Sequence, residues 1–136
     1  CTSFTAVSMV ESGNIKPLLV FYDEPVAGFE EVPLATGVDE KFGEYLPWGP
    51  FYGISVKADT DPAIVEKLTA AAKEAYEGEG FQQYLQTTGT IPIGLTGEEA
   101  NAYMKNMQSI TCWLLYDAGV TTVEPTEYGV PRPVKK

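Results

Sequence analysis

Two pairs of carboxylates have the spacing that acid–base catalysis or Ca²⁺ binding would need. Asp59 and Asp61 lie two residues apart, and Glu98 and Glu99 are adjacent. Each pair falls where a helix is expected to start, and carboxylates at that position interact favourably with the positive end of the helix dipole. We therefore interpret both pairs as helix caps, and we predict no catalytic residue and no metal site.

The composition argues against several other classes of function. The chain of 136 residues has no histidine, so it lacks the usual general base and the commonest metal ligand. Its formal net charge of −10, with nine Lys and Arg residues, disfavours nucleic acid and anionic membrane surfaces, because both need a basic partner. We expect a protein that is not an enzyme and uses no cofactor.

Cysteine usage leaves the cellular compartment open. Cys1 and Cys112 are the only cysteines, and they fit neither a zinc site nor a Cys-x-x-Cys redox motif. They would form one disulfide or stay as free thiols. A cysteine at the first position is also typical of a lipid-anchored bacterial protein, whereas no apolar run reaches the ~20 residues of a membrane span.

Turn and capping signals in the first half predict one helix and two strands. Hydroxyl residues at the start and Gly13 at the end favour a short helix over residues 2–10. The apolar stretches 15–22 and 51–56 have the length and composition of strands. Residues 23–49 are rich in proline, glycine and acids, which indicates connecting structure.

Three helices are expected in the second half. The first spans residues 61–78, starts with aspartate followed by proline, and carries one apolar stripe. A short helix should cover residues 81–86. The third spans residues 96–119 and opens with a Thr-x-x-Glu capping box. Trp113 and Cys112 lie off its apolar stripe, which indicates a second packing surface for another polypeptide segment or a partner subunit.

Four short strings occur in a fixed order along the chain. They are ESGNIKPLLV at 11–20, FEEVP at 29–33, FYG and ADTDPAIVEKL between 51 and 68, and LTGEE at 95–99 before a helix that ends in AGV. Together they resemble the tripartite tricarboxylate transporter receptors, also called Bug-type solute-binding proteins. The resemblance covers almost the whole chain up to Thr121.

The resemblance implies an α/β fold that is part of a two-lobed, type II-like periplasmic-binding-protein fold, with the N-terminal half absent. Residues 1–49 would be the end of lobe 2, and 50–57 the crossing strand or hinge. Residues 58–120 would be the C-terminal helical part of lobe 1, and 121–136 an extended tail. Two short strands, or three if residues 91–93 form another, cannot cover the apolar helix faces, so the missing half or a partner subunit is needed.

The resemblance also implies a small carboxylate ligand, such as a tricarboxylate, a dicarboxylate or a related organic acid. Helix N-termini bind anions through unpaired N–H groups without a lysine or arginine. Thr2, Ser3 and Thr5, at the start of the first helix, are the leading ligand-binding candidates. Simple helix capping is an equally weighted alternative. Phe51 would stack on the ligand, pack, or hold the hinge.

Three positions depart from the family pattern. Cys1 replaces a common aspartate, and Phe21 and Tyr22 replace a Thr-Ser pair at a strand end. A smaller, more apolar or aromatic ligand than a tricarboxylate would suit these aromatic side chains. Core packing is the favoured alternative for Phe21, whereas the phenol of Tyr22 needs a polar partner and is the stronger ligand-binding candidate.

The resemblance therefore implies a bacterial receptor in the periplasm or another extracytoplasmic location, with a membrane anchor at Cys1 as an alternative. Such a receptor captures a small organic carboxylate and delivers it to the membrane permease subunits of the transporter. The alternative function is a non-transport ligand-sensing or protein-interaction module built on the same fold.

Overall fold

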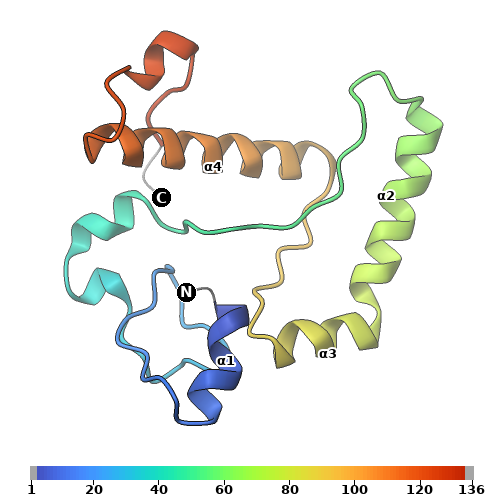
Figure 1. Ribbon diagram of the computed structural model, residues 1–136. Helices are drawn as coiled ribbons and strands as arrows, with labels where there is room; N and C mark the ends of the chain where they lie inside the picture. Colours follow the sequence, from blue (N-terminus) through green and yellow to red (C-terminus); the bar gives the residue numbers. More distant parts are fainter. Residues whose placement is uncertain (1–2, 134–136) are drawn as a thin grey trace. The chain divides into compact units, whose positions relative to one another are not determined.

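A computed structural model describes residues 3–133 as helices joined by long irregular segments (Figure 1). The α-helices of this part are α1 Ser3–Glu11, α2 Pro62–Glu77, α3 Glu79–Thr87 and α4 Gly97–Asp117. Short 3-10 helices, η1 Ala35–Gly37, η2 Glu40–Glu44 and η3 Pro125–Tyr128, lie in the connecting segments.

The expected α/β fold is wrong. The structure is 50% helical and 2% strand, with no sheet in residues 3–133, which is not a two-lobed α/β architecture. Residues 15–22 contribute a single parallel bridge, between Val20 and Leu34. Residues 52–56 form no backbone hydrogen bond with any other described residue. The composition of both segments favours an extended chain, but a sheet requires several paired strands, and a single bridge at Val20 does not make one.

The chain divides into two compact units. Unit 1 combines residues 1–15 with residues 49–97, and unit 2 combines residues 16–48 with residues 98–136. Each unit is therefore built from two stretches that are distant in the sequence.

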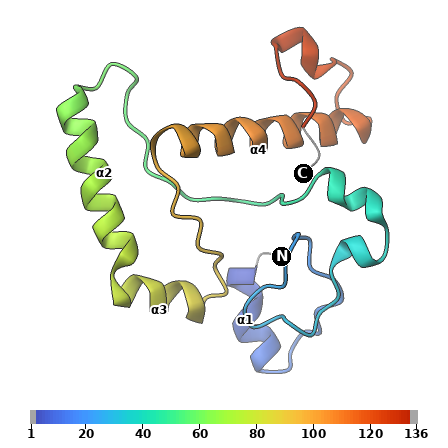
Figure 2. The same cartoon turned by 180° about the vertical axis from the view of Figure 1, so that it is seen from behind.

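Local signals define the helices of unit 1. Helix α1 is followed by Gly13 with φ of 72°, a left-handed conformation that favours glycine, as predicted. The Asp61 carboxylate accepts a hydrogen bond of 2.8 Å from the backbone N–H of Ala63, which confirms the predicted cap of α2. Helix α3 follows α2 after Gly78 and turns sharply away from it in both views (Figures 1 and 2).

Aromatic side chains hold α2 and α3 together. The ring of Phe81 lies 6.2 Å from that of Tyr76 and 6.3 Å from that of Tyr84, between ring centroids. Gln82 Nε2 donates to the carbonyl of Tyr76. Leu85 is the buried residue of α3, whereas α2 has no buried residue along its whole length. Unit 1 therefore leaves the predicted apolar stripe of α2 uncovered.

The core of unit 2 forms on one side of α4. Met107, Ile110 and Trp113 are 5%, 2% and 3% exposed, at intervals of three residues along one side of the helix. The core face therefore includes Trp113, which the sequence placed off the apolar stripe. Other buried residues of this unit are Val26, Phe29, Ala35 and Pro125. Trp113 was predicted to face another polypeptide, but the structure buries it within its own unit.

The exposed surface is larger than a compact fold of this mass requires. The chain exposes 10284 Å². Even two separate compact domains of half its 14.8 kDa mass would together expose only about 8,400 Å². Apolar groups contribute to this excess, including Tyr52 and Ile54 at 90% and 85% exposure.

A matched pair of methionines tests the core of unit 2. Met107 is 5% exposed and Met104 is 45% exposed on the same helix. We expect Met107→Ala to lower the free energy of unfolding by about 2–4 kcal/mol, because it leaves a cavity. Met104→Ala should cost less than about 1 kcal/mol. Urea unfolding followed by tryptophan fluorescence reports on this unit, since Trp48 and Trp113 both lie in it. Equal losses for the two variants would contradict the described core.

Candidate functional site

An aromatic cluster in unit 2 brings together the two site residues predicted at the end of the first expected strand. The ring of Phe21 packs edge-on against that of Phe42, with 5.4 Å between centroids. Phe21 nevertheless remains 52% exposed, and Tyr22 is half-buried. The phenol of Tyr22 lies near enough to Asp23 and to Tyr103 of α4 for electrostatic interaction. We use the name aromatic cluster for two pairs of residues, Phe21 with Phe42 and Tyr22 with Tyr103, which are linked because Phe21 and Tyr22 are adjacent in the chain.

Both phenols of this cluster stay protonated at neutral pH. Partial burial raises the pKa of Tyr22 above 10.0, and the nearby Asp23, Tyr103 and Glu24 raise it further. Partial burial and then Asp23 raise the pKa of Tyr103 in the same way. A protonated phenol can donate a hydrogen bond to a carboxylate, whereas the charge of Asp23 repels a ligand with many negative charges.

A second polar network ties the C-terminal tail to the end of α4. Arg132 forms a bidentate ion pair with Asp117, with both N–O distances at 2.8 Å. The hydroxyl of Tyr45 also donates to the Asp117 carboxylate. Because Asp117 ends α4, where the helix dipole is negative, its charge needs a cation, and Arg132 supplies one.

The tail also covers the indole of Trp113. The guanidinium carbon of Arg132 lies 4.0 Å from the ring centroid, which is a cation–π contact. Trp113 Nε1 donates to the carbonyl of Val130 at 3.2 Å, and Ser109 Oγ donates to that of Pro131 at 2.6 Å. Residues 121–133, predicted to be extended, therefore contain η3 and pack against α4.

The electrostatics of this network point to a structural role. Hydrogen bonds from Arg132 and then from Tyr45 hold the pKa of Asp117 below its usual 3.8. The hydrogen bond from Tyr45 to Asp117 raises the pKa of Tyr45. The hydrogen bonds from Arg132 to Asp117 likewise raise the pKa of Arg132. Asp117 stays ionised, and Arg132 contacts both Asp117 and Trp113, so this pair holds the tail on α4. Neither side chain can exchange a proton readily near neutral pH.

The remaining predicted ligand-binding residues belong to unit 1 or lie outside the described residues. Thr2 is outside them, as is Cys1. Ser3 begins α1 without a described side chain, and Thr5 is exposed in the same helix. Phe51 is 41% exposed in the extended segment after Gly49. Their roles in ligand binding stay predictions.

The described part of the chain contains neither a metal-binding group of residues nor a membrane-spanning helix. No three acidic or cysteine side chains in residues 3–133 gather closely enough to hold a metal ion. The helices of the same region are too short or too polar to cross a bilayer. Cys112 is a free thiol.

Sequence reasoning missed Tyr103, Asp117 and Arg132. Tyr103 lies in the helix expected over residues 96–119, where the sequence favours core packing for an aromatic side chain on the apolar face. Arg132 is the single arginine of the chain, and its residue type favours cation–π contacts and bidentate ion pairs. Its pairing with Asp117, 15 residues earlier, depends on a chain reversal that no local motif specifies.

One curated protein resembles this chain over a substantial part. The UPF0065 protein in the clcB-clcD intergenic region of Pseudomonas knackmussii is 29% identical to it over 100 residues. These residues make up 73% of this chain but 57% of that protein, so the chain spans little more than half of it. UPF0065 is the family of Bug tripartite tricarboxylate receptors, which agrees in part with the four strings in the sequence. No family model and no solved structure matches the chain.

Removing the arginine of the tail tests the network on α4. We expect Arg132→Ala to release residues 121–133 and expose Trp113, because the variant loses both the ion pair and the cation–π contact. In a Trp48→Phe background, tryptophan emission should shift to longer wavelength. Lys105→Ala, which removes an exposed cation from the same helix, should leave the emission unchanged. Unchanged emission in Arg132→Ala would contradict the contact.

The depressed pKa of Asp117 predicts an acid-induced release of the same tail. A carboxylate with a folded pKa below its unfolded 3.8 contributes stability above about pH 4. That contribution is lost as the pH falls through the folded pKa. The emission of Trp113 should therefore shift as the pH falls below about 4. Asp117→Asn should already show the shifted emission at neutral pH, whereas Asp59→Asn should keep the wild-type profile. A wild-type profile in Asp117→Asn would exclude Asp117 as the titrating group.

Proposed function

We propose that this chain is the ligand-binding part of a Bug-type receptor that captures a small carboxylate for a tripartite tricarboxylate transporter. The observation that carries the proposal is the similarity to the UPF0065 protein over 100 residues, together with the four strings in family order. Because the chain spans 57% of that relative, capture and delivery by a whole receptor belong to this proposal.

The aromatic cluster of unit 2 is the proposed ligand contact. The phenol of Tyr22, which lies near that of Tyr103, would donate a hydrogen bond to the carboxylate, and the exposed ring of Phe21 would pack against the apolar part of the ligand. Asp23 beside these phenols disfavours a trianion, especially in a chain of net charge −10. A monocarboxylate with an aromatic or aliphatic body fits this chemistry better than a tricarboxylate.

The location and partners follow from the proposed receptor role. A receptor of this kind would work in the periplasm or elsewhere outside the cytoplasmic membrane, and it would pass its ligand to membrane permease subunits. Additional polypeptide, either the rest of a longer receptor or a partner subunit, would cover apolar groups such as Ile54.

A protein-interaction module is the second candidate function. The observation that favours it is that α2 has no buried residue, and that Ile64 and Leu68 of its apolar stripe are exposed. A module of this kind would bind another polypeptide through the helix and would need no small ligand. Ligand-induced stabilisation separates the two functions.

Thermal unfolding with a panel of aromatic and aliphatic monocarboxylates, dicarboxylates and tricarboxylates tests the receptor proposal. A ligand at 100 times its dissociation constant stabilises the folded state by about 2.7 kcal/mol and raises the midpoint temperature. We expect the largest rise for a monocarboxylate. Absence of a rise with every member of the panel would overturn the proposal.

A single hydroxyl tests the contact itself. Tyr22→Phe should weaken the best ligand about 3- to 10-fold, because the variant loses one hydrogen bond and keeps the ring. Tyr128→Phe is the control, because Tyr128 is 78% exposed in the same unit. Equal ligand affinity of Tyr22→Phe and the wild-type chain would show that the ligand does not bind at Tyr22.

A further inference from the structure

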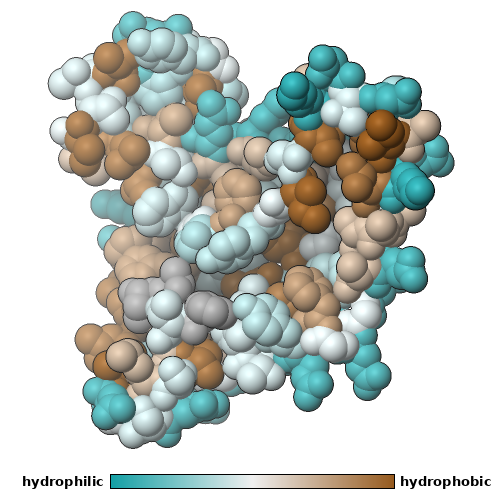
Figure 3. Space-filling view, turned by 45° about the vertical axis from the view of Figure 1, so that its right-hand side comes forward, coloured by the Kyte–Doolittle hydropathy of each residue, from teal (hydrophilic) through white to brown (hydrophobic). Residues whose placement is uncertain are grey.

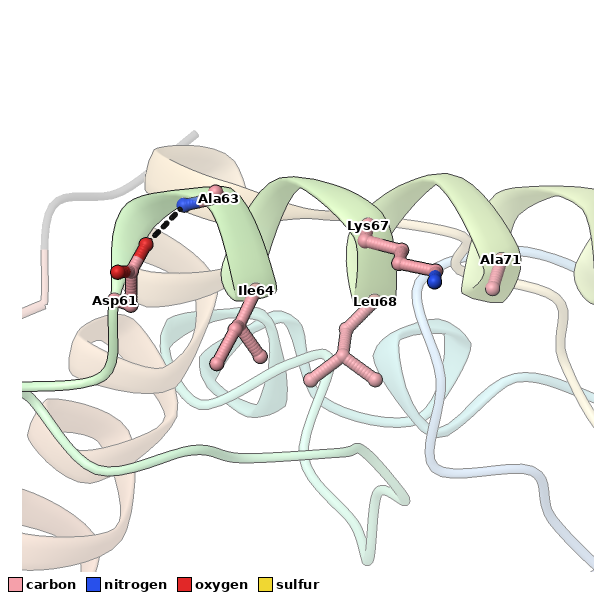
Figure 4. A pocket seen from close by; sticks show the side chains of 6 residues that line it. All are labelled: Asp61, Ala63, Ile64, Lys67, Leu68 and Ala71. Atoms are coloured by element: carbon pink, nitrogen blue, oxygen red, sulfur yellow. Dashed lines mark hydrogen bonds between the residues drawn. The ribbon is translucent and has the colours of Figure 1, made fainter.

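Helix α2 presents an exposed apolar stripe with the spacing of a helix–helix seam. Ile64 and Leu68 are 53% and 46% exposed, and Ala71 and Ala75 are also on the surface. The intervals of four, three and four residues are those of the a and d positions of a heptad. Figure 4 shows Ile64, Leu68 and Ala71 pointing to the same side of the helix, and an open apolar groove runs along them.

The stripe divides into a large half and a small half. Its N-terminal part carries Ile64 and Leu68, and its C-terminal part carries Ala71 and Ala75. In an antiparallel pair of α2 helices, Ile64 faces Ala75 of the other copy and Leu68 faces Ala71. Each layer then combines one large and one small side chain, which fills space evenly. A parallel pair would instead place Ala71 against Ala71 and leave a void.

The charges beside the stripe have the same antiparallel symmetry. Lys67 and Glu74 occupy the flanking g positions of this heptad, and both are exposed. Flanking g positions face each other across an antiparallel pair, so Lys67 of one copy meets Glu74 of the other, twice in each dimer. Glu66 and Lys73 lie at the f positions, on the outer side of the helix, and do not take part.

We infer that α2 is a self-association surface through which two copies of this chain form an antiparallel, two-fold symmetric dimer. The space-filling view shows hydrophobic side chains beside hydrophilic ones over this helix (Figure 3). The contact is small, since 16 residues span about 24 Å. The dimer is therefore weak and reversible, because interfaces of this size belong to the transient class. Self-repulsion of two copies with charge −10 makes it stronger at higher salt.

Sedimentation equilibrium of the 136-residue chain over roughly micromolar to millimolar concentration tests the dimer. We expect a reversible monomer–dimer equilibrium. Lys67→Glu should weaken it about tenfold, because two attractive pairs become repulsive. Glu74→Lys should have a similar effect, and the double variant that exchanges the two charges should return to near the wild-type dissociation constant. Restoration by the exchange requires the antiparallel register.

Two further variants keep the test decisive. Lys73→Glu makes the same charge change at an f position of the same helix and should leave the dissociation constant unchanged. Leu68→Glu should abolish the dimer, with circular dichroism to confirm that the helices persist. A chain that stays monomeric throughout, equal losses for Lys67→Glu and Lys73→Glu, failure of the exchange to restore affinity, or a dimer that survives Leu68→Glu would each overturn the inference.

Discussion

The contact between the C-terminal tail and α4 holds unit 2 together. Without residues 130–132, the indole of Trp113 would lose the carbonyl that accepts its N–H and the guanidinium that covers its ring. Asp117 would then end α4 with an uncompensated charge against the helix dipole. Arg132 therefore contacts both the buried Trp113 and the carboxylate at the end of α4. The hydroxyl of Tyr45 donates to the same carboxylate.

Unit 1 shows the opposite situation. Its helices are well defined by caps and glycine ends, but they bury little: α2 has no buried residue, and residues 52–56 have no backbone partner in residues 3–133. Helical stability in proteins comes mainly from packing of an apolar face. The proposed antiparallel dimer would supply the packing that α2 lacks within this unit.

The sequence predicted what is encoded locally. Asp61 before a proline, and Gly13 and Gly119 after helices, act within a few residues, and the structure has the expected helix ends there. The prediction of two strands was wrong, because a strand needs a paired neighbour and sequence composition does not specify one. Burial of Trp113 was missed for a similar reason, since the residues that cover it lie 17 to 19 positions later. Of the proposed ligand contact, Tyr22 was predicted from its type, whereas Tyr103 depends on how α4 packs.

Ligand binding at the aromatic cluster of unit 2 is the central claim, and two-dimensional ¹H–¹⁵N NMR tests it most directly. A carboxylate that raises the unfolding temperature would be titrated into the labelled chain. Saturable shifts of the amide signals of Phe21, Tyr22 and Tyr103, with those of α2 unchanged, are the predicted result. Saturable shifts confined to other residues, or no saturable shift with any carboxylate, would contradict it.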